Sequence, residues 1–189
     1  MHGCRYPGRV TTPPFAPLAP ADIAVLRSQL GREPRGVVGI AARCICGNPT
    51  VVATAPRLPD GTPFPTFYYL THPAATAAMS TLEAEHVMPE LQELLADDDV
   101  RAAYEAAHLA YLADRAQFGE VPEIAGISAG GMPTRVKCLH ALAGHALAAG
   151  PGVNPIGDAA LARSPWSPAR CVCAEPGAAL RPEPTAEAE

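Results

Sequence analysis

The chain has 189 residues and a formal net charge of −5, and 48% of its residues are hydrophobic. This length and apolar content are enough for one domain with a real core and exclude a wholly disordered protein. The mild negative charge and the absence of a long basic run argue against a nucleic-acid partner. No segment approaches the roughly 20 consecutive apolar residues of a membrane helix. The first residues also lack a signal peptide's apolar stretch, so we expect a cytoplasmic protein.

The first part of the chain alternates apolar runs with turn residues. Apolar positions at helical spacing predict a helix over 21–30. Runs of β-branched and aromatic residues predict strands over 36–46, 50–55 and 64–71, separated by Cys-Gly-Asn-Pro and Pro-Asp-Gly turns. Three strands joined by short turns predict an antiparallel meander.

Everything after this meander is predicted to be helical. Residues 80–83 fit a capping box, Pro89 fits the first turn of another helix, and the acidic run 97–99 suits the start of a long helix. A further helix is expected to begin at Pro133 and to end at Ala149, and a short one follows.

These elements predict an α+β protein with one domain. Residues 1–20 are rich in proline and are expected to form a flexible arm. Residues 21–163 should form the domain, in which the meander packs against four to five helices. Residues 164–189 are rich in proline, alanine and glutamate, and we expect a disordered tail.

The segment 128–137 gathers the features of an anion site. Its glycine pair leaves the backbone open to a ligand, and a helix that begins at Pro133 would present unpaired amides to a phosphate or carboxylate. Two cations follow. The candidate ligand-binding residues are Ser128, Gly130, Gly131, Arg135 and Lys137. The alternative is that the glycines only turn the chain and that both cations face solvent.

Two residues are candidates for catalysis. Cys138 would lie in the first turns of the helix that begins at Pro133, where the helix dipole and the cations favour a thiolate. His108 belongs to a stripe on the long helix, with Tyr104, Tyr111 and Arg115, which could line a polar pocket around an acid–base histidine. The alternatives are ordinary packing of a cysteine and a half-buried helix face.

A serine motif at residues 126–130 matches the Gly-x-Ser-x-Gly nucleophile elbow. An α/β-hydrolase requires a strand before the serine, followed in the chain by an acidic residue and then a histidine. A polar connector precedes this serine, and no histidine follows Asp158. Chain order therefore excludes that class of hydrolase.

Six cysteines in a cytosolic chain are expected to be reduced thiols or metal ligands. A tetrahedral zinc site is chemically reasonable in two forms. The first consists of Cys44, His72, Cys138 and His140. The second consists of Cys44, Cys46, Cys171 and Cys173, although Cys-x-Cys spacing differs from the Cys-x-x-Cys knuckle of zinc ribbons. The residues leave open which set, if either, binds zinc.

Several phrases of the chain are similar to an uncharacterised bacterial family, domain of unknown function 501. They are Arg57–Thr66, Tyr69–Thr71, Ala107–His108 with Tyr111–Leu112, and Ser128–Gly157. The resemblance covers roughly residues 30–160 and implies no activity, cofactor or catalytic residue.

Two classes of function therefore remain open, and the sequence predicts no oligomeric state. One is a cytosolic domain that binds a small anionic molecule, with or without catalysis. The other is a zinc-stabilised or plain protein-interaction module without catalysis.

Overall fold

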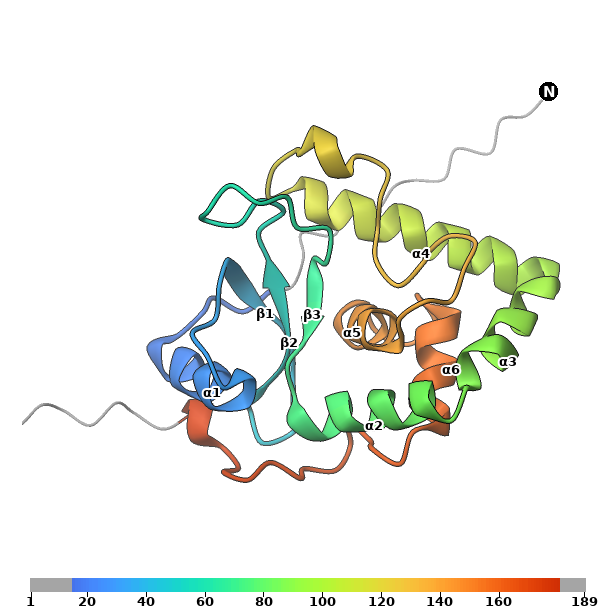
Figure 1. Ribbon diagram of the computed structural model, residues 1–189. Helices are drawn as coiled ribbons and strands as arrows, with labels where there is room; N and C mark the ends of the chain where they lie inside the picture. Colours follow the sequence, from blue (N-terminus) through green and yellow to red (C-terminus); the bar gives the residue numbers. More distant parts are fainter. Residues whose placement is uncertain (1–14, 181–189) are drawn as a thin grey trace, which may run out of the picture.

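The computed structural model describes residues 15–180, which form a three-stranded antiparallel sheet and six α-helices (Figure 1). The strands are β1 (Val37–Arg43), β2 (Pro49–Thr54) and β3 (Tyr68–Leu70), in the order β1-β2-β3. The α-helices are α1 (Pro20–Leu30), α2 (Pro73–Ala84), α3 (Val87–Glu93), α4 (Asp98–Ala116), α5 (Leu139–Ala149) and α6 (Pro155–Arg163). Three short 3-10 helices are η1 (Leu94–Ala96), η2 (Pro122–Ile124) and η3 (Ala178–Leu180). The predicted α+β class and meander are confirmed, with one α-helix more than expected.

Both faces of the sheet are covered by helices. Helix α1 lies on one face and α5 on the other, where α2, α4 and α6 are arranged around α5 (Figure 1). Every residue of β2 is therefore buried. On the α1 side, Leu26, Ile40 and Val52 form a small cluster, whereas the main core lies on the α5 side. Full burial of one such aliphatic side chain stabilises the fold by about 1.5–3 kcal/mol.

Within residues 15–180, no helix is both long enough and apolar enough to cross a lipid bilayer.

Helix α5 begins at Leu139, so the predicted start at Pro133 is wrong. The residues before it form a closed turn, because the amide of Arg135 donates to the Gly131 carbonyl at 2.9 Å and the amide of Lys137 donates to the Gly130 carbonyl at 2.8 Å. Gly131 has a φ of 95°, and a Cβ there would lie 2.6 Å from the carbonyl oxygen of Arg135. The glycines are thus needed for this turn itself.

The predicted capping box at residues 80–83 is also wrong, because these residues lie inside α2. Helix α2 begins earlier, at Pro73, where the Nδ1 atom of His72 accepts a hydrogen bond from the amide of Ala75 at 3.4 Å. The carboxylate of Glu83 accepts a hydrogen bond from the amide of Leu139 at 2.7 Å instead. Glu83 therefore stabilises the start of α5 rather than of its own helix.

The segment 164–180 runs from α6 past α2 and ends at η3 beside α1 (Figure 1). Trp166 is 5% exposed and belongs to the main core. Asn48, which begins the approach to β2, donates to the carbonyl of Glu175 at 2.8 Å and accepts from the amide of Ala179 at 3.0 Å. These contacts hold the segment against the domain. The predicted arm and tail continue into residues 1–14 and 181–189, which lie outside the described residues.

Candidate metal centre

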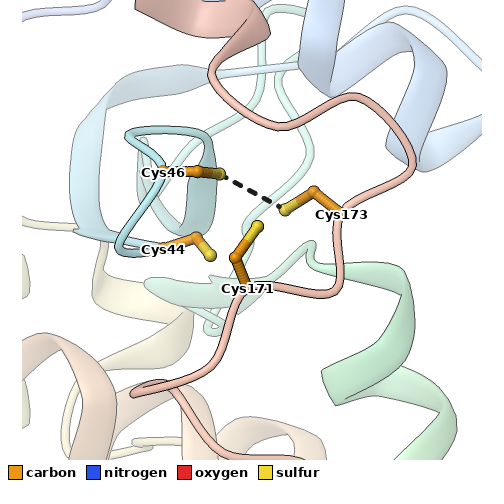
Figure 2. A group of neighbouring side chains, drawn as sticks. All are labelled: Cys44, Cys46, Cys171 and Cys173. Carbon is orange, nitrogen blue, oxygen red and sulfur yellow. Dashed lines mark hydrogen bonds between the residues drawn. The ribbon is translucent and has the colours of Figure 1, made fainter.

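Four cysteine side chains from two distant parts of the chain meet at one point (Figure 2). They are Cys44 and Cys46, in the turn after β1, and Cys171 and Cys173, in the segment after α6. All four Sγ atoms lie within 4.8 Å of one another, and those of Cys46 and Cys173 are 3.6 Å apart. With Zn–S bonds of about 2.3 Å, a zinc tetrathiolate has S–S edges of about 3.8 Å. Small side-chain movements would therefore let the four sulfur atoms hold one ion.

The turn that carries the first pair is fixed by Arg43, the last residue of β1. Its guanidinium donates to the carbonyl of Gly47 at 2.8 Å and to the carboxylate of Asp22 at 2.7 Å. Asp22 is fully buried, so the ion pair is partly shielded from water. The amide of Cys44 donates to the Asn48 carbonyl at 2.8 Å and closes the turn.

The strand predicted over residues 36–46 would place the side chains of Cys44 and Cys46 on opposite faces. That expectation assumed that the strand continues to Cys46. Because β1 ends at Arg43 and the chain then turns, the alternation of a strand no longer applies, and both sulfur atoms reach the same point.

Cys46 ionises more readily than Cys44 and Cys173. For Cys46, burial raises the pKa, but the amides of Asn48 and Gly177 and the neighbouring thiols outweigh it and lower the pKa to about 6. Burial is the main cause that raises the pKa of Cys44 and of Cys173, and for Cys173 hydrogen bonds with neighbouring thiols raise the pKa further. One thiolate therefore forms readily, while its neighbours resist a second negative charge unless a cation compensates it.

His72 contacts one of the four cysteines, Cys173, without being one of the four candidate ligands. Because its Nδ1 accepts the amide of Ala75, Nε2 carries the proton and donates to the Sγ of Cys173 at 3.3 Å. Burial lowers the pKa of His72, which keeps the ring neutral. Such contacts orient a metal ligand and stabilise its charge. Next to it, a cavity of about 800 Å³ has both Cys173 and His72 in its wall and extends along α1.

The first predicted metal set is not brought together. Cys44 belongs to the four-cysteine group, and His72 contacts that group through Cys173. Cys138 and His140 instead form a second group with Glu83, in which one donor atom of each lies within 4.8 Å of the others. Sequence reasoning missed Glu83 because its position suggested a capping box. No local pattern marked it as a neighbour of Cys138, the residue that precedes α5.

In this second group the imidazole of His140 lowers the pKa of the Cys138 thiol, and burial opposes the shift. The thiol in turn raises the pKa of His140, to which Glu83 also contributes. Cys138 is the residue that precedes the first turn of α5, rather than a residue within the helix. The main cause of the lowered pKa of Cys138 is thus His140, rather than the cations Arg135 and Lys137.

The predicted ligand-binding loop is packed against its own chain. A Cβ on Gly130 would lie 2.5 Å from a methyl group of Leu142, and Gly131 is equally crowded. Arg135 and Lys137 are exposed, and the amide at the start of α5 already binds Glu83. Anion binding by this loop stays a prediction, and it now depends on those two cations.

Inside the protein, His108 and Ser128 bind each other. The Nδ1 atom of His108 is 2.8 Å from the hydroxyl of Ser128, which also contacts the carbonyl of Met132 at 3.4 Å. Both side chains are less than a tenth exposed, and burial lowers the pKa of His108. Nearby, Tyr104 donates to the carbonyl of Arg135. The polar stripe of α4 thus anchors the loop before α5, while catalysis by His108 or Cys138 stays a prediction.

The chain was also compared with known proteins. A family model described as Protein of unknown function (DUF501) matches residues 40–162, well over half of the chain. The match includes Cys44 and Cys46 as well as the whole group around Cys138, and it ends before Cys171. A search of curated proteins and a search of solved structures gave no match.

Proposed function

The chain belongs to the DUF501 family, and we propose that its function as a folded module depends on one zinc ion held by four cysteines. The ligands are Cys44, Cys46, Cys171 and Cys173. The observation that carries the proposal is the meeting of four free thiols within 4.8 Å of one another, from segments far apart in the sequence.

The donor set favours a single zinc ion. Four thiolates in a tetrahedron form a closed coordination shell, which is the usual arrangement of a structural zinc site. In an iron–sulfur cluster the four thiolates are divided among two or four iron atoms, so thiolates on different iron atoms lie further apart than the sulfur atoms of a mononuclear site. The short separations in this group therefore support one ion.

The centre would connect two parts of the domain that are otherwise held by few polar contacts. It joins the turn after β1 to the segment after α6, and Cys46 and Cys173 are 127 positions apart in the sequence. A cross-link over so long a loop restricts the unfolded chain strongly, and metal binding is coupled to folding. The ion would thus secure residues 164–180, all of which lie outside the family match. We infer a metal-stabilised module.

Elemental analysis and native mass spectrometry of the purified full chain test this proposal. We expect zinc in the wild type and the loss of one zinc per chain in the Cys171→Ser/Cys173→Ser variant. Val172→Ala is the control, because Val172 lies between the two substituted cysteines and is 44% exposed, and it should keep the wild-type zinc content. A strong chelator should lower the melting temperature of the wild type.

Wild-type protein that folds without metal and melts identically with zinc and with chelator would overturn the proposal. Cobalt provides a test that needs no variant. Cobalt bound by four thiolates should give intense sulfur-to-metal charge-transfer bands, and their absence at saturating cobalt would also overturn it.

A further inference from the structure

The second group of metal-ligand side chains lies where α2 meets the start of α5. Glu83 is in the last turn of α2, whereas Cys138 and His140 flank the first residue of α5. The Nδ1 atom of His140 is 3.2 Å from Oε1 of Glu83, and a donor atom of each of the three residues lies within 4.8 Å of the others. One sulfur, one nitrogen and one oxygen donor therefore converge.

The imidazole of His140 is oriented by α2. Its Nε2 atom is 3.1 Å from the carbonyl oxygen of Thr76 and 3.1 Å from the hydroxyl of Ser80. A carbonyl oxygen only accepts hydrogen bonds, so Nε2 carries a proton and Nδ1 is the atom directed toward Glu83. Metal-binding histidines are commonly fixed in this way, with one ring nitrogen donating to a backbone carbonyl and the other bound to the ion.

The carboxylate of Glu83 is held by the start of α5. Oε1 of Glu83 accepts the amide of Leu139 at 2.7 Å, which ties the end of α2 to the start of α5. The side chains of Glu83 and His140 are each 27% exposed. The group is therefore ordered by hydrogen bonds and also open to solvent on one side.

We propose that Glu83, Cys138 and His140 bind a second zinc ion, with a fourth coordination position left open to solvent. Three protein ligands and one open position are the arrangement of catalytic zinc sites, in contrast to the closed four-cysteine centre. A carboxylate, a thiolate and a neutral imidazole together balance the charge of the ion. The open position suits water or an anionic oxygen ligand, and zinc lowers the pKa of a bound water.

This site would belong to the family-matched part of the chain. Its three ligands all lie within residues 40–162, whereas two ligands of the four-cysteine centre lie beyond them. Zinc binding at the second site thus requires no ligand from the segment after α6.

Peptide-resolved alkylation of the full chain with iodoacetamide tests the second site separately from the first. The thiolate sulfur displaces iodide and forms a thioether, and a bound metal ion blocks this reaction. We expect saturating zinc to slow alkylation of Cys138 by roughly tenfold or more in the wild type and to have little effect on Cys138 in His140→Ala. His86→Asn is the control, because His86 is an exposed histidine close in sequence to Glu83 and its backbone is in the left-handed region, which Asn tolerates.

An alkylation rate of Cys138 that is the same with and without zinc would overturn the proposal, and so would equal protection in His140→Ala. If His140→Ala does not fold, Glu83→Gln retains an acceptor for the amide of Leu139 and removes the charge. The zinc concentration that gives half protection should then rise by roughly tenfold or more. If the four-cysteine centre does not bind zinc, zinc will fail to protect the peptides that carry Cys44, Cys46, Cys171 and Cys173. Protection of the Cys138 peptide is measured separately, so failure of one site is distinguishable from failure of the other.

Discussion

His145 of α5 should make the domain sensitive to acid. The residue is fully buried, with its ring stacked on Tyr68 at a centroid distance of 5.4 Å and edge-on to Tyr111 at 5.2 Å. The side-chain amide of Asn154 donates to its Nδ1 at 3.2 Å, so the proton is on Nε2, which has no hydrogen-bond partner within residues 15–180. Burial lowers the pKa of His145 from 6.5 to about 4.

The sign of the effect follows from this depressed pKa. As the pH falls below 6.5, the unfolded chain takes up a proton at this residue and the folded protein does not. The stabilising contribution is therefore complete above pH 6.5 and is lost as the pH falls toward 4. At about pH 5 the shift corresponds to a loss of about 2 kcal/mol of unfolding free energy relative to neutral pH.

Urea unfolding of the wild type and of His145→Gln, at about pH 7.5 and about pH 5, measures this contribution. Glutamine does not titrate, and its oxygen can still accept from Asn154. The variant should lose about 2 kcal/mol less than the wild type between the two pH values. His72 and His108, whose pKa burial also lowers, titrate in both proteins and cancel in the difference. Equal pH dependence in the two proteins would refute the reasoning.

Three further predictions concern the segment after α6 and the two candidate sites. Trp166→Ala should reduce the unfolding free energy by about 3–5 kcal/mol in a urea titration, because the ring belongs to the core, and an unchanged value would show that it does not. His72→Ala should weaken zinc binding by roughly 10–100-fold in competition with a chromophoric chelator, because Cys173 loses its donor; equal affinity would remove His72 from the centre. If the loop before α5 binds anions, phosphate should raise the melting temperature of the wild type and not of Arg135→Ala, whereas no shift in either protein would assign the loop a structural role.

Local sequence patterns were sufficient for the elements whose stability is local. The acidic run 97–99 at the start of α4 predicted that helix well, because acidic side chains interact favourably with the positive end of the helix dipole. The start of α5 was missed for the opposite reason. The turn before it depends on the hydroxyl of Tyr104, which binds the carbonyl of Arg135 from 31 residues away. No window of sequence around Pro133 contains that partner.

The candidate sites show the same limit more strongly. The four-cysteine set was recognisable as a chemical possibility, but the pairing of Cys46 with Cys173 depends on how β1 ends and on where the chain goes after α6. Glu83 lies on α2, more than fifty residues before Cys138, and its carboxylate reaches the start of α5 only after α2 packs against α5. The residue types indicated metal binding, but which side chains meet depends on the tertiary fold.

Zinc K-edge X-ray absorption of the zinc-loaded His140→Ala variant tests the central claim most directly, because this substitution removes the second site. We predict one zinc per chain with four sulfur ligands at about 2.3 Å. A shell that contains nitrogen or oxygen ligands, or fewer than four sulfur atoms, would contradict the assignment of Cys44, Cys46, Cys171 and Cys173 as the ligands.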